Sequence, residues 1–182
     1  KAYDGIRDPL WSRGLGDVYK RQALGDAIAV ALLEAKNFGS EDFAKSHPGG
    51  KLGKRLIVTV EDLMTKGDEL PLVSEENTLS ETLIEISAKG LGVALVVDKK
   101  KLIGIFTDGD LRRTLNNEKN PLGKKISSFM TSKTKTILAH SLAIDALAIM
   151  QANKIYSLAV LDKNEALVGI IRMHDLIESG LI

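Results

Sequence analysis

The stretch Gly92–Leu111, GVALVVDKKKLIGIFTDGDL, decides the fold that we expect for most of this chain. Two short apolar runs, GVALVVD and LIGIFT, flank lysines that form a turn, so the stretch predicts two strands joined as a hairpin. Asp108 follows the second run and can cap a helix that carries Leu111 and Leu115. The stretch therefore predicts two strands followed by a helix.

Most of the chain consists of two similar segments, and this hairpin belongs to the first. The first segment runs from Asp62 to Arg113 and the second from Ser128 to Ser179. Both open on a Met-Thr pair, and both close on the phrase Leu-x-Gly-Ile followed by Asp-Leu. The offset between them is 66 residues at the start and 65 at the end, so the copies differ by one deletion.

Each copy predicts the same order of elements. In the first copy, Thr78 and Glu81 form a capping box that opens a helix before the hairpin. In the second, Ser141 caps the corresponding helix, and the strands YSLAVLD and ALVGII precede a short helix over MHDLIES. Because a copy of about 50 residues makes a marginal core alone, we expect the two sheets to pack against each other.

This repeated β-α-β-β-α order, with these phrases, resembles the cystathionine-β-synthase (CBS) domain, which occurs as tandem pairs. The resemblance implies an α/β (α+β) fold with a first CBS domain at residues 60–116 and a second at residues 124–182. It also implies a regulatory role, with an adenosine-containing ligand bound in clefts between the two copies.

The phrase Gly104-Ile-Phe-Thr107-Asp-Gly-Asp110 matches a motif often found in nucleotide-binding CBS pairs, Gly-h-x-Thr/Ser-x-x-Asp, where h is apolar. Glycine in a strand lets a ligand approach the backbone. A carboxylate accepts hydrogen bonds from both ribose hydroxyls, and a hydroxyl beside a helix N-terminus suits phosphate. Gly104, Thr107 and Asp110 are therefore candidate nucleotide-binding residues. The alternative is that Thr107 and Asp108 only end a strand and cap a helix.

The second copy keeps the aspartate of this motif, Asp175, but has Arg172 in place of the hydroxyl residue. Arg172 either pairs with a phosphate or points to solvent. We therefore expect at most one well-formed nucleotide site and a second, doubtful one, for which Asp175 is the candidate residue.

Residues 23–55 differ in character from the repeats. An apolar helix begins at Ala23, and its nearly complete apolar circumference predicts that it is buried. Ser40 can cap a second short helix, and the turn-rich loop SHPGGKLG then presents His47. The passage ALGDAIAVALLEA…FAKSHPGGKLGKRL, running into a CBS pair, resembles the end of the sugar isomerase (SIS) domain in the arabinose-5-phosphate isomerase family.

Those isomerases interconvert ribulose 5-phosphate and arabinose 5-phosphate, on the way to a sugar acid of bacterial lipopolysaccharide or capsule. The resemblance implies this activity without a catalytic cofactor, and it places the family's catalytic histidine at His47. Histidine suits proton transfer during aldose–ketose isomerisation because its pKa lies near neutrality. His140 and His174 have no such match, and we expect His174 beside the second cleft.

The family's serine-rich phosphate-binding loop, catalytic lysine and glutamates have no counterpart here, because the sequence before Ala23 is too short and matches none of them. We therefore predict that the chain as given has no isomerase activity. The segment DVYKRQ, residues 17–22, resembles the translation of a transposon end sequence that is widely appended to DNA in sequencing libraries. We interpret residues 1–22 as a foreign segment, and the alternative is a genuine disordered N-terminal arm.

Composition excludes several classes of protein. The net charge of +1 and the scattered basic residues argue against a nucleic-acid partner or an anionic membrane surface. The absence of cysteine excludes disulfides and cysteine-ligated metal sites. The longest apolar run, Ala27–Leu33, is too short to span a bilayer. We expect a cytoplasmic homo-oligomer, a dimer or a tetramer, because CBS pairs and SIS domains both tend to associate.

Two interpretations of the function remain open. The first is the C-terminal part of a sugar-phosphate isomerase, with a sugar phosphate as the parent enzyme's substrate, whose CBS pair regulates it or holds its subunits together. The second is a free-standing CBS-pair module that binds an adenine nucleotide or a nucleotide-sugar. Under either interpretation, Asp110→Ala should abolish ligand binding and leave the melting temperature nearly unchanged.

Overall fold

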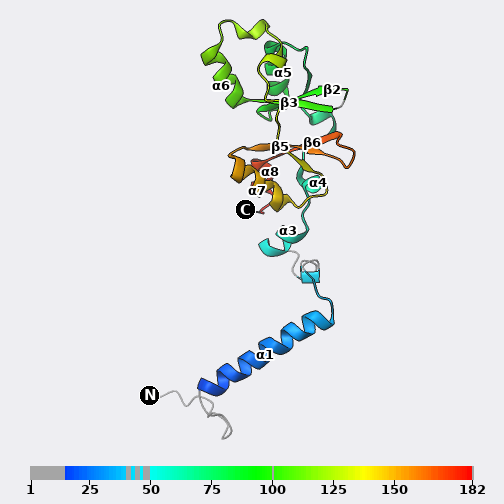
Figure 1. Cartoon of the computed structure of the whole chain (residues 1–182), viewed down its shortest axis with the longest axis vertical. Coiled ribbons are helices and arrows are strands. Elements are labelled where there is room, and N and C mark those ends of the chain that lie inside the picture. Colours follow the sequence, from blue (N-terminus) through cyan, green and yellow to red (C-terminus); the bar gives the residue numbers. More distant parts are fainter. Residues whose placement is uncertain (1–14, 40–41, 44–45, 47–49, 100, 182) are drawn as a thin grey trace. The chain divides into compact units, whose positions relative to one another are not determined.

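The structure is a computed structural model of the chain, and it describes residues 15–39, 42–43, 46, 50–99 and 101–181 (Figure 1). The chain divides into two units, Lys1–Pro48 and Gly49–Ile182, each with its own elements. Ser40, the predicted cap of a short helix, and His47, the candidate catalytic residue, lie outside the described residues.

The described part of the first unit consists mainly of the helix α1 (Leu15–Ala35). This helix begins at Leu15 and continues without a break through Ala23, where we expected it to start. Its apolar side chains Leu24, Ile28 and Leu32 are 52–62% exposed, so they are not buried within this unit. The described residues of this unit contain no sheet against which the apolar side chains could pack.

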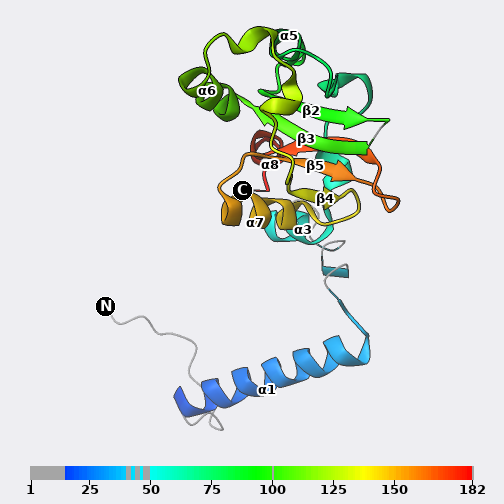
Figure 2. The same ribbon diagram turned by 45° about the horizontal axis from the view of Figure 1, so that its top comes forward.

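The second unit contains two three-stranded sheets of the same topology (Figures 1 and 2). In each sheet the short first strand is parallel to the second, and the second pairs with the third as the predicted antiparallel hairpin. The strands are β1 (Leu72–Ser74), β2 (Val93–Asp98) and β3 (Lys101–Thr107) in the first copy, and β4 (Thr136–Leu138), β5 (Ser157–Leu161) and β6 (Leu167–Arg172) in the second.

Helices cover the outer face of each sheet, so the layers run helix, sheet, sheet, helix (Figure 2). The predicted capping box opens α5: the Thr78 hydroxyl accepts a hydrogen bond from the Glu81 amide, and the Glu81 carboxylate accepts one from the Thr78 amide. The helices are α5 (Leu79–Lys89) and α6 (Asp108–Asn117) in the first copy, α7 (Ala143–Asn153) and α8 (Met173–Glu178) in the second, and α3 (Lys51–Ile57) and α4 (Val60–Leu63) before the repeats.

Two predicted helix caps were wrong. The N-cap of α6 is Thr107 and not Asp108, because Asp110, three residues on, accepts a hydrogen bond from the Thr107 amide at 2.9 Å. α7 begins after Leu142 and has no side-chain cap. Ser141 lies one residue before the N-cap Leu142, and its backbone carbonyl accepts a hydrogen bond from the Val60 amide at 2.9 Å.

The two copies exchange their opening segments. Thr65, at the start of the first copy, forms a two-way backbone bridge with Ile170 on β6 of the second copy. Thr131, at the start of the second copy, forms the corresponding bridge with Ile105 on β3 of the first. Each Met-Thr phrase of the repeat therefore completes the other copy.

A shared core lies between the two sheets. Val93 and Leu95 of β2 pack in one buried cluster with Ala159 of β5 and Ile170 of β6, and all four are at most 1% exposed. This cluster confirms the expected sheet-to-sheet packing. The opposite face of each sheet packs against helices of its own copy in a separate cluster.

The short helix α3 contacts the end of the chain. Lys54 Nζ donates to the carbonyl of Ser179 at 2.9 Å, and Arg55 Nε donates to the carbonyl of Leu181 at 3.2 Å. Ser179 is the C-cap of α8, and cations are favourable beside the carbonyls at a helix C-terminus. The segment before the repeats is thereby bound to the last helix of the second copy.

Candidate functional site

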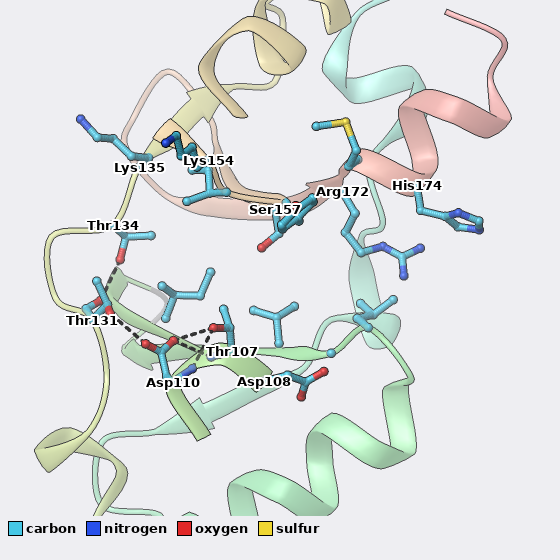
Figure 3. Close-up of a pocket in the computed structure, with 18 of the residues that line it drawn as sticks. Thr107, Asp108, Asp110, Thr131, Thr134, Lys135, Lys154, Ser157, Arg172 and His174 are labelled. Carbon is cyan, nitrogen blue, oxygen red and sulfur yellow. Dashed lines mark hydrogen bonds between the residues drawn. The ribbon is translucent and has the colours of Figure 1, made fainter. Parts of the chain in front are cut away.

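A cleft of about 940 Å³ lies between the two copies, where β3 and β6 end and α6 and α8 begin. Because the copies are related in topology, each contributes a strand end, a helix start and the segment before its second strand. Figure 3 shows the cleft, and the lining residues labelled there are Thr107, Asp108, Asp110, Thr131, Thr134, Lys135, Lys154, Ser157, Arg172 and His174.

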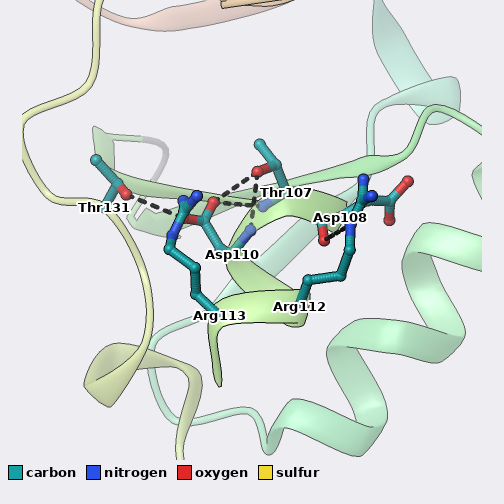
Figure 4. A network of polar contacts seen from close by, with 6 residues as sticks. All are labelled: Thr107, Asp108, Asp110, Arg112, Arg113 and Thr131. Carbon is teal, nitrogen blue, oxygen red and sulfur yellow. Dashed lines mark hydrogen bonds and ion pairs between the residues drawn. The ribbon is translucent and has the colours of Figure 1, made fainter. Parts of the chain in front are cut away.

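Asp110 is the most buried carboxylate of the lining, with 7% of the residue exposed. One carboxylate oxygen, Oδ2, accepts hydrogen bonds from the amide of Thr107 at 2.9 Å and from its hydroxyl at 2.7 Å. The other, Oδ1, forms an ion pair with Arg113 and lies 3.5 Å from the Thr131 hydroxyl (Figure 4). The Thr-x-x-Asp motif is thus a helix capping box whose second oxygen faces the cleft.

The two partners of the Asp110–Arg113 pair differ in exposure. The Arg113 side chain is 69% exposed and the Asp110 side chain 9%, so the guanidinium can return to water when another donor takes its place at the buried carboxylate. A ligand hydroxyl can therefore replace the guanidinium at Oδ1 while Oδ2 keeps its bonds to Thr107. Asp110 Oδ1 is then a charged acceptor for the hydroxyls of a polyol, on the side of the cleft that the first copy lines.

The second copy presents a different arrangement. Asp175 Oδ2 accepts a hydrogen bond from the Arg172 amide at 2.8 Å, as in the first copy, but Oδ1 accepts one from Arg172 Nη2 at 2.6 Å. Both side chains are largely covered, at 23% exposure for Arg172 and 10% for Asp175. Arg172 lines the cleft, whereas Asp175 is not among the described lining residues.

We expected Gly104 to lie on the cleft. It is absent from the described lining residues. A Cβ at this position would lie 2.5 Å from Sδ and 2.9 Å from Cγ of Met130. The space that glycine leaves is therefore occupied by a side chain of the other copy. The structure brings together Thr107, Asp110 and Arg172 at the cleft, and it places Gly104 and Asp175 behind its surface.

Sequence reasoning missed the segment that follows the second Met-Thr phrase. Thr131, Lys133, Thr134 and Lys135 line the cleft beside the first copy's motif, although they belong to the second copy. The repeat could have indicated this segment, because a Met-Thr phrase opens each copy and an opening segment can pair with the other copy. Lys154 likewise reaches the cleft from the end of α7.

The predicted loop position of His140 and the position of His174 near a cleft agree with the structure. His140 is exposed in the turn before α7, and His174 lines the cleft, where its Nε2 lies 3.0 Å from Glu178 Oε1. Both side chains of this pair are more than half exposed. In the part of the chain that the structure describes, no group of three His, Cys, Asp or Glu side chains could hold a metal ion.

The family model for the CBS domain matches residues 60–117 and 126–181. The chain belongs to the CBS-domain family. Its two matched regions contain the two sheets and the cleft between them. None of the described helices has the length and apolar character that a membrane crossing needs.

The chain is also similar to curated enzymes. It is 48% identical over 158 residues to arabinose 5-phosphate isomerase KdsD of Francisella tularensis and 49% identical over 160 residues to the enzyme of that name in Pseudomonas aeruginosa. Each match covers 87% of this chain but 48% and 49% of the respective enzymes. The chain thus spans about half the length of the curated relatives that it matches.

Solved structures of CBS pairs share the fold. The CBS domain pair of protein MJ0100, in complex with 5′-methylthioadenosine and S-adenosyl-L-methionine, matches with a TM-score of 0.62 at 22% identity, over 68% of this chain and 96% of that one. CBSX2 in complex with AMP matches with a TM-score of 0.58 at 23% identity, over the same shares of the two chains.

Proposed function

We propose that this chain is the C-terminal part of a sugar-phosphate isomerase, and that its CBS pair is the regulatory part of that enzyme. The identity of 48–49% over 87% of the chain to curated arabinose 5-phosphate isomerases carries the proposal. The parent enzyme would convert ribulose 5-phosphate to arabinose 5-phosphate, a cytoplasmic step towards lipopolysaccharide. Residues 23–55 would be the end of its sugar isomerase domain, with His47 as a catalytic residue.

The purified chain should show no turnover of ribulose 5-phosphate, because it spans about half of the relatives' length and its sequence has no counterpart of the resembled family's phosphate-binding loop, lysine and glutamates. An assay for arabinose 5-phosphate, with a curated relative as positive control, measures this. Measurable turnover by the purified chain would refute the prediction of inactivity.

A free-standing CBS module is the alternative, and it draws on the cleft between the copies with Thr107 and Asp110. Sequencing genomic DNA across codons 22 and 23 separates the two. An upstream frame that encodes a parallel α/β domain with a serine-rich loop supports the isomerase. A frame that starts near Lys1 refutes it and leaves the module.

We propose further that the cleft binds an adenine nucleotide or a nucleotide-sugar through Asp110. The support is the buried carboxylate with one exchangeable oxygen, beside the hydroxyls of Thr107 and Thr131. Charge-assisted hydrogen bonds from two ribose hydroxyls to such a carboxylate are stronger than neutral ones. The solved CBS pairs with AMP and with adenosine derivatives agree with this ligand class.

Asp110→Asn tests the nucleotide proposal in the full chain. The amide keeps an acceptor for Thr107 but removes the charge, so we expect AMP affinity measured by calorimetry to fall about tenfold or more. Because Asp110 also caps α6, the melting temperature should fall slightly, contrary to the sequence-based expectation for Asp110→Ala. Glu81→Gln, which weakens the capping box of α5 away from the cleft, is the matched control. Unchanged AMP affinity in Asp110→Asn would contradict the assignment.

The expected homo-oligomer is tested on the same sample. Light scattering after gel filtration should give the mass of a dimer or a tetramer. A monomer at working concentration would contradict this expectation.

A further inference from the structure

Arg172 occupies the position in the second copy that Thr107 occupies in the first. Figure 3 shows its side chain reaching from the end of β6 into the cleft, across from Thr107 and Asp108 of the first copy. The side chain is only 23% exposed, so its guanidinium does not simply point into bulk solvent. Arg172 is therefore a partly desolvated cation on the cleft wall.

Asp175 holds this guanidinium in place. Its Oδ1 accepts from Nη2 at 2.6 Å, and its Oδ2 accepts from Nε at 3.3 Å and from the Arg172 amide at 2.8 Å. Asp175 thus has both oxygens engaged by one largely covered residue. Opening that pair for a ribose would leave the 23% exposed Arg172 guanidinium without a partner, which is costly, whereas Arg113, at 69% exposure, returns to water when it leaves Asp110.

The guanidinium still has donors for an anion. Arginine carries five N–H donors, and one on Nε and one on Nη2 are bonded to Asp175, so the second donor of Nη2 and the two donors of Nη1 remain. Guanidinium groups match the geometry of phosphate oxygens. The other charged side chains of the lining are mostly basic, with Arg112, Lys133, Lys135 and Lys154 against Asp108 outside the Asp110–Arg113 pair.

We propose that the cleft holds one 5′-phosphorylated nucleoside per chain, with its ribose on Asp110 of the first copy and its phosphate on Arg172 of the second. Asp175 is then a positioning residue for Arg172 and not a second ribose site. The proposal rests on nucleotide binding at Asp110, as proposed above, and it specifies the ligand class. It follows that adenosine derivatives without a phosphate bind weakly to this chain.

Calorimetry on the full chain with AMP and adenosine as probes tests the proposal. We expect one AMP per chain, bound about tenfold to a hundredfold more tightly than adenosine, since hydrogen bonds to charged groups are of that strength. In Arg172→Gln the affinity for AMP should fall to that for adenosine, while adenosine binding stays unchanged. Arg172→Lys, which keeps the charge, should restore part of the difference.

Asp175→Asn tests the positioning role. It should reduce the AMP preference over adenosine without changing adenosine affinity, because it acts only through the phosphate contact. Glu178→Gln, on the same helix and more than half exposed, is the matched control and should leave both affinities unchanged. Melting curves of all variants confirm that they are folded.

The outcomes separate this inference from the nucleotide proposal. Equal affinity for AMP and adenosine, two AMP per chain, or equal losses of both probes in Arg172→Gln would overturn the Arg172 assignment and leave Asp110 as a nucleoside site. No binding of either probe to the unmodified chain would overturn both.

Discussion

At the scale of single residues, the glycines of the two motifs serve packing between the copies. A Cβ on Gly104 would lie 2.5 Å from Sδ of Met130, and a Cβ on Gly169 would lie 2.5 Å from Sδ of Met64. Gly169 has a second constraint, because its Cβ would also lie 2.9 Å from the backbone oxygen of Thr65. A methionine side chain can move aside, but a bridged backbone segment cannot.

The two glycines should therefore differ in their tolerance of alanine. We expect Gly169→Ala to lower the free energy of unfolding by about 1–3 kcal/mol through overpacking and Gly104→Ala to lower it less. Gly123→Ala is the control, since nothing lies within 4 Å of its Cβ position. Urea unfolding measures all three. Equal losses for Gly104→Ala and Gly169→Ala would show that the Thr65 carbonyl does not restrict the site.

At the scale of elements, the same capping arrangement recurs at several helix starts. A carboxylate three residues after the N-cap accepts a hydrogen bond from the N-cap amide at Thr59, Thr78, Thr107 and Arg172. The Thr-x-x-Asp motif at the cleft is one of these boxes. Its capping role alone therefore does not mark a ligand site, and the burial of Asp110 and its position at the cleft distinguish it.

The capping box of α4 predicts a pH dependence. Hydrogen bonds from the Thr59 hydroxyl and then from the Thr59 amide lower the pKa of Asp62. A lowered folded-state pKa means that the stabilisation is present above the unfolded value of about 3.9 and is lost as the pH falls through the folded one. Wild-type stability should therefore decline on acidification below about pH 4, in part through this group.

Asp62→Asn removes that contribution. We expect a loss at pH 7 of at most about 1 kcal/mol, reduced by solvent screening because the carboxylate is largely exposed. The variant and the wild type should converge towards pH 2 in urea unfolding, and Glu61→Gln is the neighbouring control. A difference between variant and wild type that persists unchanged at pH 2 would contradict the ionic origin of the effect.

At the scale of the unit Gly49–Ile182, we expect the two copies to unfold as one cooperative structure. Their sheets share the buried cluster that contains Leu95 and Ala159, and their opening segments are exchanged through the bridges at Thr65 and Thr131. A copy without the other would lose one face of its sheet's packing and one bridged segment. The cleft exists only in the pair, because residues of both copies line it.

Leu95→Ala tests this cooperativity. Leu95 lies between the sheets with no exposed surface, so we expect a loss of about 2–5 kcal/mol. Hydrogen exchange should accelerate for the amides of β5 in the second copy as well as for those of β2. Leu115→Ala, at an exposed position of α6, is the control. Acceleration confined to the first copy would show that the copies unfold separately.

The sequence alone determined the repeat, the hairpins, the Thr78–Glu81 capping box and the sheet-to-sheet packing. These features depend on local periodicity and on phrases that recur at a fixed offset, so one copy predicts the other. It also singled out Thr107 and Asp110, through the resemblance of residues 104–110 to the motif of nucleotide-binding CBS pairs.

Only the tertiary structure determined which copy's motif each cleft residue lies beside. The exchange of the Met-Thr segments fills the space beside Gly104 with Met130 and brings Thr131 and Lys135 to the first copy's motif. Those outcomes depend on contacts between residues that are far apart in the chain. Such contacts are set by how the two sheets pack, and no local pattern encodes them.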